Sequence, residues 1–147
     1  MPGRSRRIPL LPPLLLGALA LAGACSGGGD TAQGDPYVAF VAPTDGETLC
    51  GEAIPIDLDV RNYQLTSVVE TDPEKVPSGI GHAHIYLNGQ YVYEGDSEHF
   101  ALDQPVEDGA WQLKVELANE NHSAVEPYVY DLIYITVDNT LCDGGDT

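Results

Sequence analysis

Basic residues are scarce in this sequence of 147 residues, which has 6 Lys and Arg against 23 Asp and Glu and a formal net charge of −17 at pH 7. Arg4, Arg6 and Arg7 lie within the first seven residues, so the chain from residue 25 onward carries a net charge near −20. Electrostatic binding to nucleic acid or to anionic lipid headgroups needs cations that neutralise phosphate. The composition therefore argues against both as partners.

Several catalytic and binding motifs are also absent. The sequence has no Walker loop, no Gly-x-Ser-x-Gly, no cysteine pairs at zinc-finger spacing and no Asp-x-Asp-x-Asp-Gly calcium loop. No serine or cysteine nucleophile stands in a recognisable setting, so we do not expect an enzyme. Hydrophobic residues make up 43% of the chain, which is enough for a folded core.

The first 24 residues predict an export signal. The three arginines form a positive region, residues 8–21 are apolar and rich in Leu, and Ala22-Gly23-Ala24 supplies small residues before Cys25. Interrupted by prolines, the apolar run is too short for a good transmembrane helix of about 20 residues. The order of charge, apolar run and small residues is typical of a cleaved signal peptide.

Cys25 predicts a lipid anchor. Leu21-Ala22-Gly23-Ala24-Cys25 resembles a bacterial lipobox, in which the cysteine is acylated, although Ala22 stands where that pattern has Leu. The polar, Gly-rich residues 25–35 fit a flexible tether, and Ser26 resembles lipoproteins sorted to the outer membrane of Gram-negative bacteria. The alternative is a plain secreted protein cut by an ordinary signal peptidase.

The other two cysteines, Cys50 and Cys142, lie near the two ends of the expected folded region. In the oxidising cell envelope an even pair predicts one disulfide, which closes a loop of about 90 residues. The alternative is two unpaired thiols.

Hydrophobic residues alternate with polar ones along most of residues 36–140, and no stretch has the period of an amphipathic helix. Asn88-Gly89 between two alternating runs is a strong hairpin signal. We expect about seven strands in an all-β, immunoglobulin-like antiparallel sandwich, with a small β-barrel as the alternative. The strands are expected near 37–42, 54–60, 81–87, 90–94, 99–102, 110–117 and 128–137, followed by an acidic tail at 141–147.

The four histidines are expected at one end of the sandwich. When every connection is a simple reversal, the strand ends that carry them all point the same way, although this does not fix the sheet on which each one lies. Two residues apart on a strand, His82 and His84 share a face. Imidazole suits copper, zinc and nickel. We expect a divalent metal, copper or zinc, bound by His82 and His84 with His122, and completed by His99, Glu98 or Glu120. The alternative is that these histidines are structural.

Two segments carry a family resemblance. The run Gly81-His82-Ala83-His84-Ile85-Tyr86-Leu87-Asn88-Gly89, followed by Leu117-Ala118-Asn119 and His122, resembles a family of small exported bacterial domains of unknown function. That resemblance covers about residues 43–138, implies a β-sandwich behind a signal peptide, and marks His82, His84 and His122 as the shared polar positions.

Together these features predict a non-catalytic module of the cell envelope that is anchored to the membrane by lipid and binds a divalent metal. The alternative is an adhesive or structural module that binds protein or glycan and whose histidines are incidental.

Overall fold

The computed structural model describes residues 34–142. The expected signal peptide, the acylated Cys25, nearly all of the tether and most of the acidic tail lie outside the described residues. Nine strands and one short 3-10 helix make up the ordered elements of this part: β1 (Tyr37–Ala42), β2 (Thr48–Leu49), β3 (Ile54–Arg61), β4 (Gln64–Leu65), β5 (Ile80–Leu87), β6 (Gln90–Gly95), β7 (His99–Leu102), β8 (Gly109–Asn119), β9 (Tyr130–Val137) and η1 (Asn139–Leu141). Within residues 34–142, no helix is long and apolar enough to cross a membrane.

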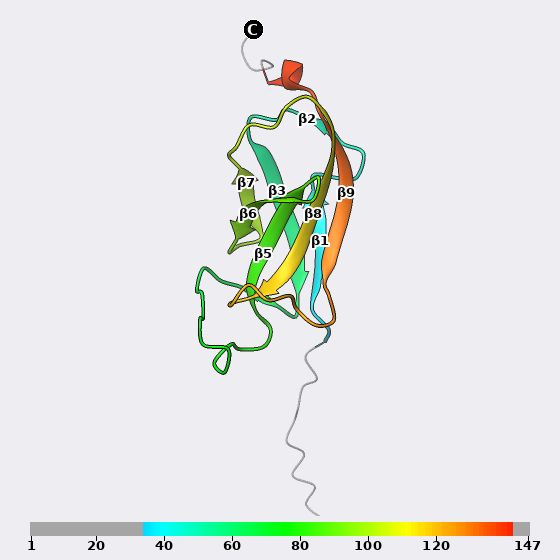
Figure 1. Cartoon of the computed structure of the whole chain (residues 1–147). Helices are drawn as coiled ribbons and strands as arrows, with labels where there is room; N and C mark the ends of the chain where they lie inside the picture. Colours follow the sequence, from blue (N-terminus) through cyan, green and yellow to red (C-terminus); the bar gives the residue numbers. More distant parts are fainter. Residues whose placement is uncertain (1–33, 143–147) are drawn as a thin grey trace, which may run out of the picture. The chain divides into compact units, whose positions relative to one another are not determined.

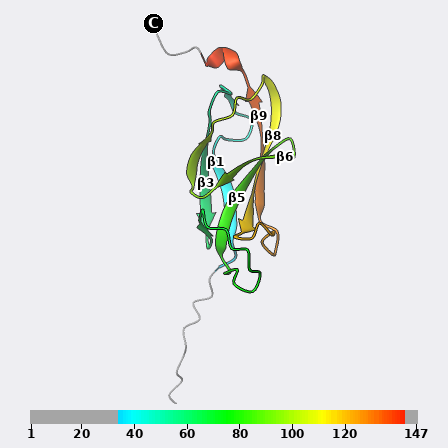
Figure 2. The same ribbon diagram turned by 60° about the vertical axis from the view of Figure 1, so that its left-hand side comes forward.

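The strands form two sheets that face each other (Figures 1 and 2). The smaller sheet has the order β1-β3-β7, and the larger has the order β2-β9-β8-β5. The far edge of β5 is shared, because β4 pairs with its first two residues and β6 pairs with the rest. The chain crosses between the sheets after β1, β2, β3, β6 and β7, as expected for an immunoglobulin-like sandwich. The sandwich is thus confirmed, and the barrel alternative is wrong because two separate sheets form.

Alternation along the strands builds the core between the sheets. Ile54, Ile56 and Leu58 of β3 are buried, as are Ala83, Ile85 and Leu87 of β5. The odd-numbered residues of β8 and β9 complete the layer, among them Leu113, Val115, Leu117, Ile133 and Ile135. Since successive side chains of a strand point to opposite faces, the even-numbered residues of β5, β8 and β9 lie on the outer face of the larger sheet.

A disulfide joins Cys50 to Cys142, as the sequence predicts. Cys50 follows β2, and Cys142 follows η1, just after β9. Because β2 pairs with β9 at Leu49 and Val137, the bond lies at the end of the sandwich where β9 finishes.

The described chain enters the sandwich at the other end. Tyr37 pairs with Arg61, the last residue of β3, and the chain then reaches β5 through β4. A small hollow is lined by Gly34 and Pro36 together with Asn62, Ser78 and Gly79. The entry point therefore lies beside the start of β5.

Candidate metal centre

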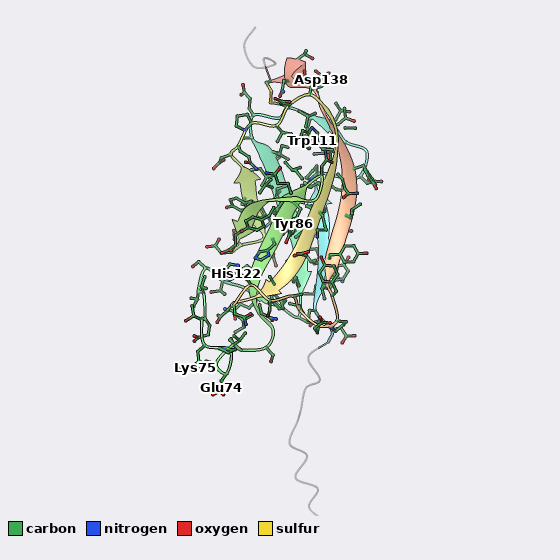
Figure 3. All side chains as sticks on the ribbon, viewed as in Figure 1. Glu74, Lys75, Tyr86, Trp111, His122 and Asp138 are labelled. Carbon is green, nitrogen blue, oxygen red and sulfur yellow. A yellow bond between two sulfur atoms is a disulfide. The ribbon has the colours of Figure 1, made fainter. Side chains whose placement is uncertain are left out.

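His82 and His84 lie on the outer face of the larger sheet, in strand β5. Their neighbours Ala83 and Ile85 point into the core, so the two imidazoles share the opposite side. Both are nevertheless buried, with 0% and 6% of their surface exposed. The side chains of Glu94 from β6 and of His122 from the loop after β8, together with the backbone carbonyl of Thr66, lie against them, near the position of His122 in Figure 3.

Close packing explains why a glycine, Gly81, directly precedes the two histidines. The hydroxyl of Tyr63 passes over this residue and donates a 2.8 Å hydrogen bond to the carbonyl oxygen of Ala118 on β8. A Cβ at position 81 would lie well inside 3.0 Å of both the Tyr63 oxygen and the Ala118 oxygen. Position 81 thus has no room for a side chain.

His122 reaches the same place from the turn after β8. Its backbone has φ = 62°, in the left-handed region. The turn is held by the N–H of His122, which donates to Asn119 O at 2.8 Å, and by the N–H of Asn119, which donates to Ser123 O at 2.9 Å. The Asn119 side chain also donates to Ser123 Oγ and to Ala124 O. These bonds fold the turn back over β5.

Glu94 completes the cluster, although no sequence motif marks it as a ligand. The Asn88-Gly89 turn pairs Leu87 with Gln90, and a regular ladder from that turn would place Tyr93 opposite His84. The register shifts by one residue between Ile85 and Tyr86, so that Glu94 lies opposite His84 instead. This β-bulge moves the carboxylate from the core side to the outer face.

The ligand atoms of His84, His122 and Glu94 form a compact triangle. Nε2 of His84 is 3.3 Å from Nδ1 of His122, which is 3.3 Å from Oε2 of Glu94; the third side measures 3.8 Å. Two ligands of a tetrahedral ion, each about 2.0–2.1 Å from the metal, are about 3.3–3.4 Å apart. The triangle therefore has the dimensions of three ligands on one ion.

The ring positions agree with this geometry. The imidazole centroids of His84 and His122 are 5.3 Å apart, and the two ring planes differ by 26°. Two imidazoles that bind one tetrahedral ion through nitrogen place their centroids about 5 Å apart. The spacing therefore fits two imidazoles on one ion, and the 5.0 Å between the His82 and His122 centroids fits as well.

His82 holds the loop that covers the site. Its Nδ1 lies 2.7 Å from the carbonyl oxygen of Thr66, and its Nε2 lies 3.4 Å from that of Glu120. A second, looser triad also exists, in which one ligand atom each from His82, Glu94 and His122 all lie within 4.8 Å of one another. Since both ring nitrogens of His82 already face backbone oxygens, the triangle with His84 is the better site.

The surroundings of His84 favour its neutral form. Burial lowers the pKa of His84 below its usual value and the nearby His122 lowers it further, while Glu94 and Glu116 oppose the change. A neutral imidazole has a free lone pair for a metal. The arrangement thus favours the form of His84 that binds an ion.

Glu116 lies behind His84, with Oε1 4.0 Å from Nδ1 of the ring. Burial raises the pKa of Glu116, but hydrogen bonds from Lys114, Tyr128 and Tyr86 outweigh this effect, and the net result is a lowered pKa. A charged carboxylate on the Nδ1 side leaves Nε2 directed at the cluster.

The structure does not bring the other expected residues into the cluster. His99 lies on β7 in the smaller sheet, is largely exposed, and its Nδ1 pairs with Asp57 at 2.9 Å. Glu120 contributes its backbone oxygen rather than its carboxylate, and Glu98 accepts a backbone hydrogen bond from Leu58. Three of the four histidines therefore gather at one end of the sandwich.

No protein-family model matches this chain, and no curated protein sequence matches it. Solved structures resemble it weakly. The fibronectin(III)-like modules of Clostridium thermocellum CbhA align at 11% identity and a TM-score of 0.47, over 73% of this chain and 49% of theirs. The endo-β-1,4-mannanase of Thermotoga petrophila aligns at 14% and 0.46, over 72% of this chain and 20% of the mannanase chain. CopC from Methylosinus trichosporium OB3b aligns at 13% and 0.40, over 71% and 94%. Similarity at this level carries no functional information about this chain.

Proposed function

We propose that this protein is a lipid-anchored β-sandwich module of the cell envelope that binds a divalent transition metal through His84, His122 and Glu94. The triangle of ligand atoms, with sides of 3.3, 3.3 and 3.8 Å, carries the proposal. His82 supports the site by bonding the covering loop at Thr66.

The donor set selects the class of metal. Two imidazoles and one carboxylate suit Zn²⁺ or Cu²⁺, whereas Cu(I) prefers thiolate or thioether sulfur. In the described part of the chain the remaining cysteines form the disulfide, so they offer no thiolate. Three protein ligands leave one tetrahedral position open for water or an outside ligand.

We give the module no catalytic role. Within residues 34–142, no serine, threonine or cysteine side chain is hydrogen-bonded to an imidazole of the cluster, so no side-chain nucleophile is paired with a base there.

Calorimetric titration of the exported chain with Zn²⁺ and Cu²⁺ tests the metal site. A Cys25→Ser background keeps acylation out of the measurement. We expect one ion to bind with a dissociation constant below about 10 µM. His122→Asn removes the imidazole while asparagine tolerates the left-handed backbone, and Glu94→Gln removes the charge without changing the shape.

Each of these two variants should weaken binding at least about tenfold. His99→Asn is the matched control, because His99 is a histidine outside the cluster. Binding no tighter than 10 µM in the parent chain, or equal affinities in His122→Asn and His99→Asn, would rule the site out.

The lipid anchor is tested separately by labelling cells with a fatty-acid analogue. The unaltered chain should be labelled and Cys25→Ser should not. If both partition equally into the aqueous phase of a detergent extraction, the protein is secreted without an anchor.

A further inference from the structure

Five of the eight tyrosines in the sequence lie on the outer face of the larger sheet. Tyr86 comes from β5 and Tyr91 from β6, while Tyr128, Tyr130 and Tyr134 come from β9 and the residues just before it. Four of them are about half exposed: Tyr91 by 48%, Tyr128 by 47%, Tyr130 by 53% and Tyr134 by 58%. Single exposed aromatics are common, but several on one sheet face indicate an interaction surface.

The rings form one connected row. Tyr91 packs edge-on against Tyr86, with centroids 5.7 Å apart, and Tyr128 lies 5.1 Å from Tyr130. The two pairs meet at Glu116, which accepts hydrogen bonds from the hydroxyls of Tyr86 and Tyr128. Figure 3 shows Tyr86 near the middle of the sandwich, between the labels of His122 toward one end and Trp111 toward the other.

Beyond this row, the face ends in an open hollow. Tyr134 lies there beside Gln112, whose side-chain amide donates to the Tyr134 hydroxyl at 3.3 Å. Asn88 and Gln112 line the hollow together with Ala110, Trp111 and Tyr134, and its volume is about 410 Å³. Aromatic rings, phenol hydroxyls and carboxamides thus alternate along one side of the sandwich.

We propose that this tyrosine face binds a neutral polysaccharide chain. The C–H faces of pyranose rings stack on aromatic rings, while their hydroxyls exchange hydrogen bonds with phenols and carboxamides; the face supplies all three groups. Tyrosine is well suited to this role, because it offers a large ring but loses little conformational entropy on binding.

Charge selects a neutral ligand over an acidic one. Lys114 is the cation on this face, and its Nζ is already bonded to Glu116 at 2.7 Å and to Tyr128 at 3.1 Å. The chain from residue 25 onward has a net charge near −20, which repels uronic acids, sialic acids and phosphates. A neutral glycan needs no free cation on this face and is not repelled by the negative charge.

Affinity electrophoresis of the whole exported chain, again with Cys25→Ser, tests this proposal. Native gels contain neutral probes (soluble β-glucan, galactomannan, xylan or dextran) or acidic ones (alginate or polygalacturonate). We expect retardation by at least one neutral polysaccharide and by neither acidic one. The double variant Tyr130→Ala/Tyr134→Ala should weaken the retardation at least tenfold.

Tyr37→Ala is the matched control, because Tyr37 is 44% exposed but lies on the smaller sheet. His122→Asn should leave glycan binding unchanged, so failure of the metal site and failure of the tyrosine face are distinguishable. The proposal is overturned if no neutral polysaccharide retards the chain, or if Tyr37→Ala loses as much as the double variant. Concentration-dependent dimerisation that disappears in the double variant, without retardation by glycan, would assign this face to a second copy of the chain and overturn it equally.

Discussion

Replacing Gly81 with alanine tests how closely the strands are packed beneath the candidate metal centre. The added Cβ would lie 2.8 Å from Asn119 Cα and closer still to the Ala118 carbonyl and the Tyr63 hydroxyl. Overpacking of this kind costs about 1–3 kcal/mol, and loss of the Tyr63 hydrogen bond costs about 1 kcal/mol more. The reduced freedom of alanine in the unfolded chain returns about 0.4–1 kcal/mol. We therefore expect Gly81→Ala to lower the free energy of unfolding by about 2–3 kcal/mol.

Urea unfolding followed by tryptophan fluorescence measures this loss. Gly89→Ala is the control for backbone strain without a clash, because position 89 has φ = 80°, whereas Gly81 is not among the glycines with a positive φ, and nothing lies within 4 Å of the added Cβ; it should cost only about 1 kcal/mol, from the backbone alone. Tyr63→Phe separates the clash with the Tyr63 hydroxyl from the clash with the Ala118 carbonyl. In that background Gly81→Ala should cost less, by about 1 kcal/mol, because the hydroxyl is gone while the Ala118 carbonyl remains.

Gly81→Ala should also affect the candidate metal centre. Since His82 follows position 81 directly, Gly81→Ala should also weaken metal binding in the calorimetric titration, whereas Gly89→Ala should not. A loss of stability below about 0.5 kcal/mol would refute the packing argument, since substitutions without a structural cost fall in that range.

Three further predictions follow from contacts described above. Replacing both Cys50 and Cys142 with serine should cost about 4–5 kcal/mol in the chain-entropy account, because the bond spans 92 residues; thiol reduction of the parent chain should give the same urea midpoint, and unequal midpoints would contradict this. The metal-free chain should lose stability as pH falls from about 6.5 through the lower pKa of folded His84, since His84 in the unfolded chain takes up its proton first. A His84→Gln variant should lose less stability between pH 7.5 and 5, and an equal slope would exclude His84 as the source of the loss. Glu116→Gln should weaken metal binding about tenfold by releasing the His84 ring, whereas Glu98→Gln should not; no change in Glu116→Gln would deny Glu116 a positioning role.

Much of the fold could be predicted because alternation is a local property of the sequence. Strands β1, β3, β5, β6 and β7 begin and end within a residue or so of the expected ranges. The two-residue strands β2 and β4 were not expected, since each forms by parallel pairing with a distant strand. Two residues are too few to show a period, so only the folded context reveals them.

The site was predictable in part for a related reason. Strand reversals place His82, His84 and His122 at one end, but they do not say on which sheet a residue lies, and His99 belongs to the other one. Glu94 could not be found from the sequence, because the Asn88-Gly89 turn predicts a regular ladder and the bulge that shifts it forms two residues further on. One extra residue in β6 decides whether the carboxylate joins the imidazoles or faces the core.

The point at which the chain enters the sandwich bears on where the candidate metal centre sits relative to a membrane. Gly34 and Pro36 lie next to the start of β5, at the end that carries the histidines. If Cys25 is acylated, as we propose, about eleven residues separate the anchor from the domain, and even fully extended they span at most about 40 Å. The tether would then keep the ion within a few nanometres of the bilayer. Exchange of metal with a protein embedded in that membrane would then be within reach of the tethered domain.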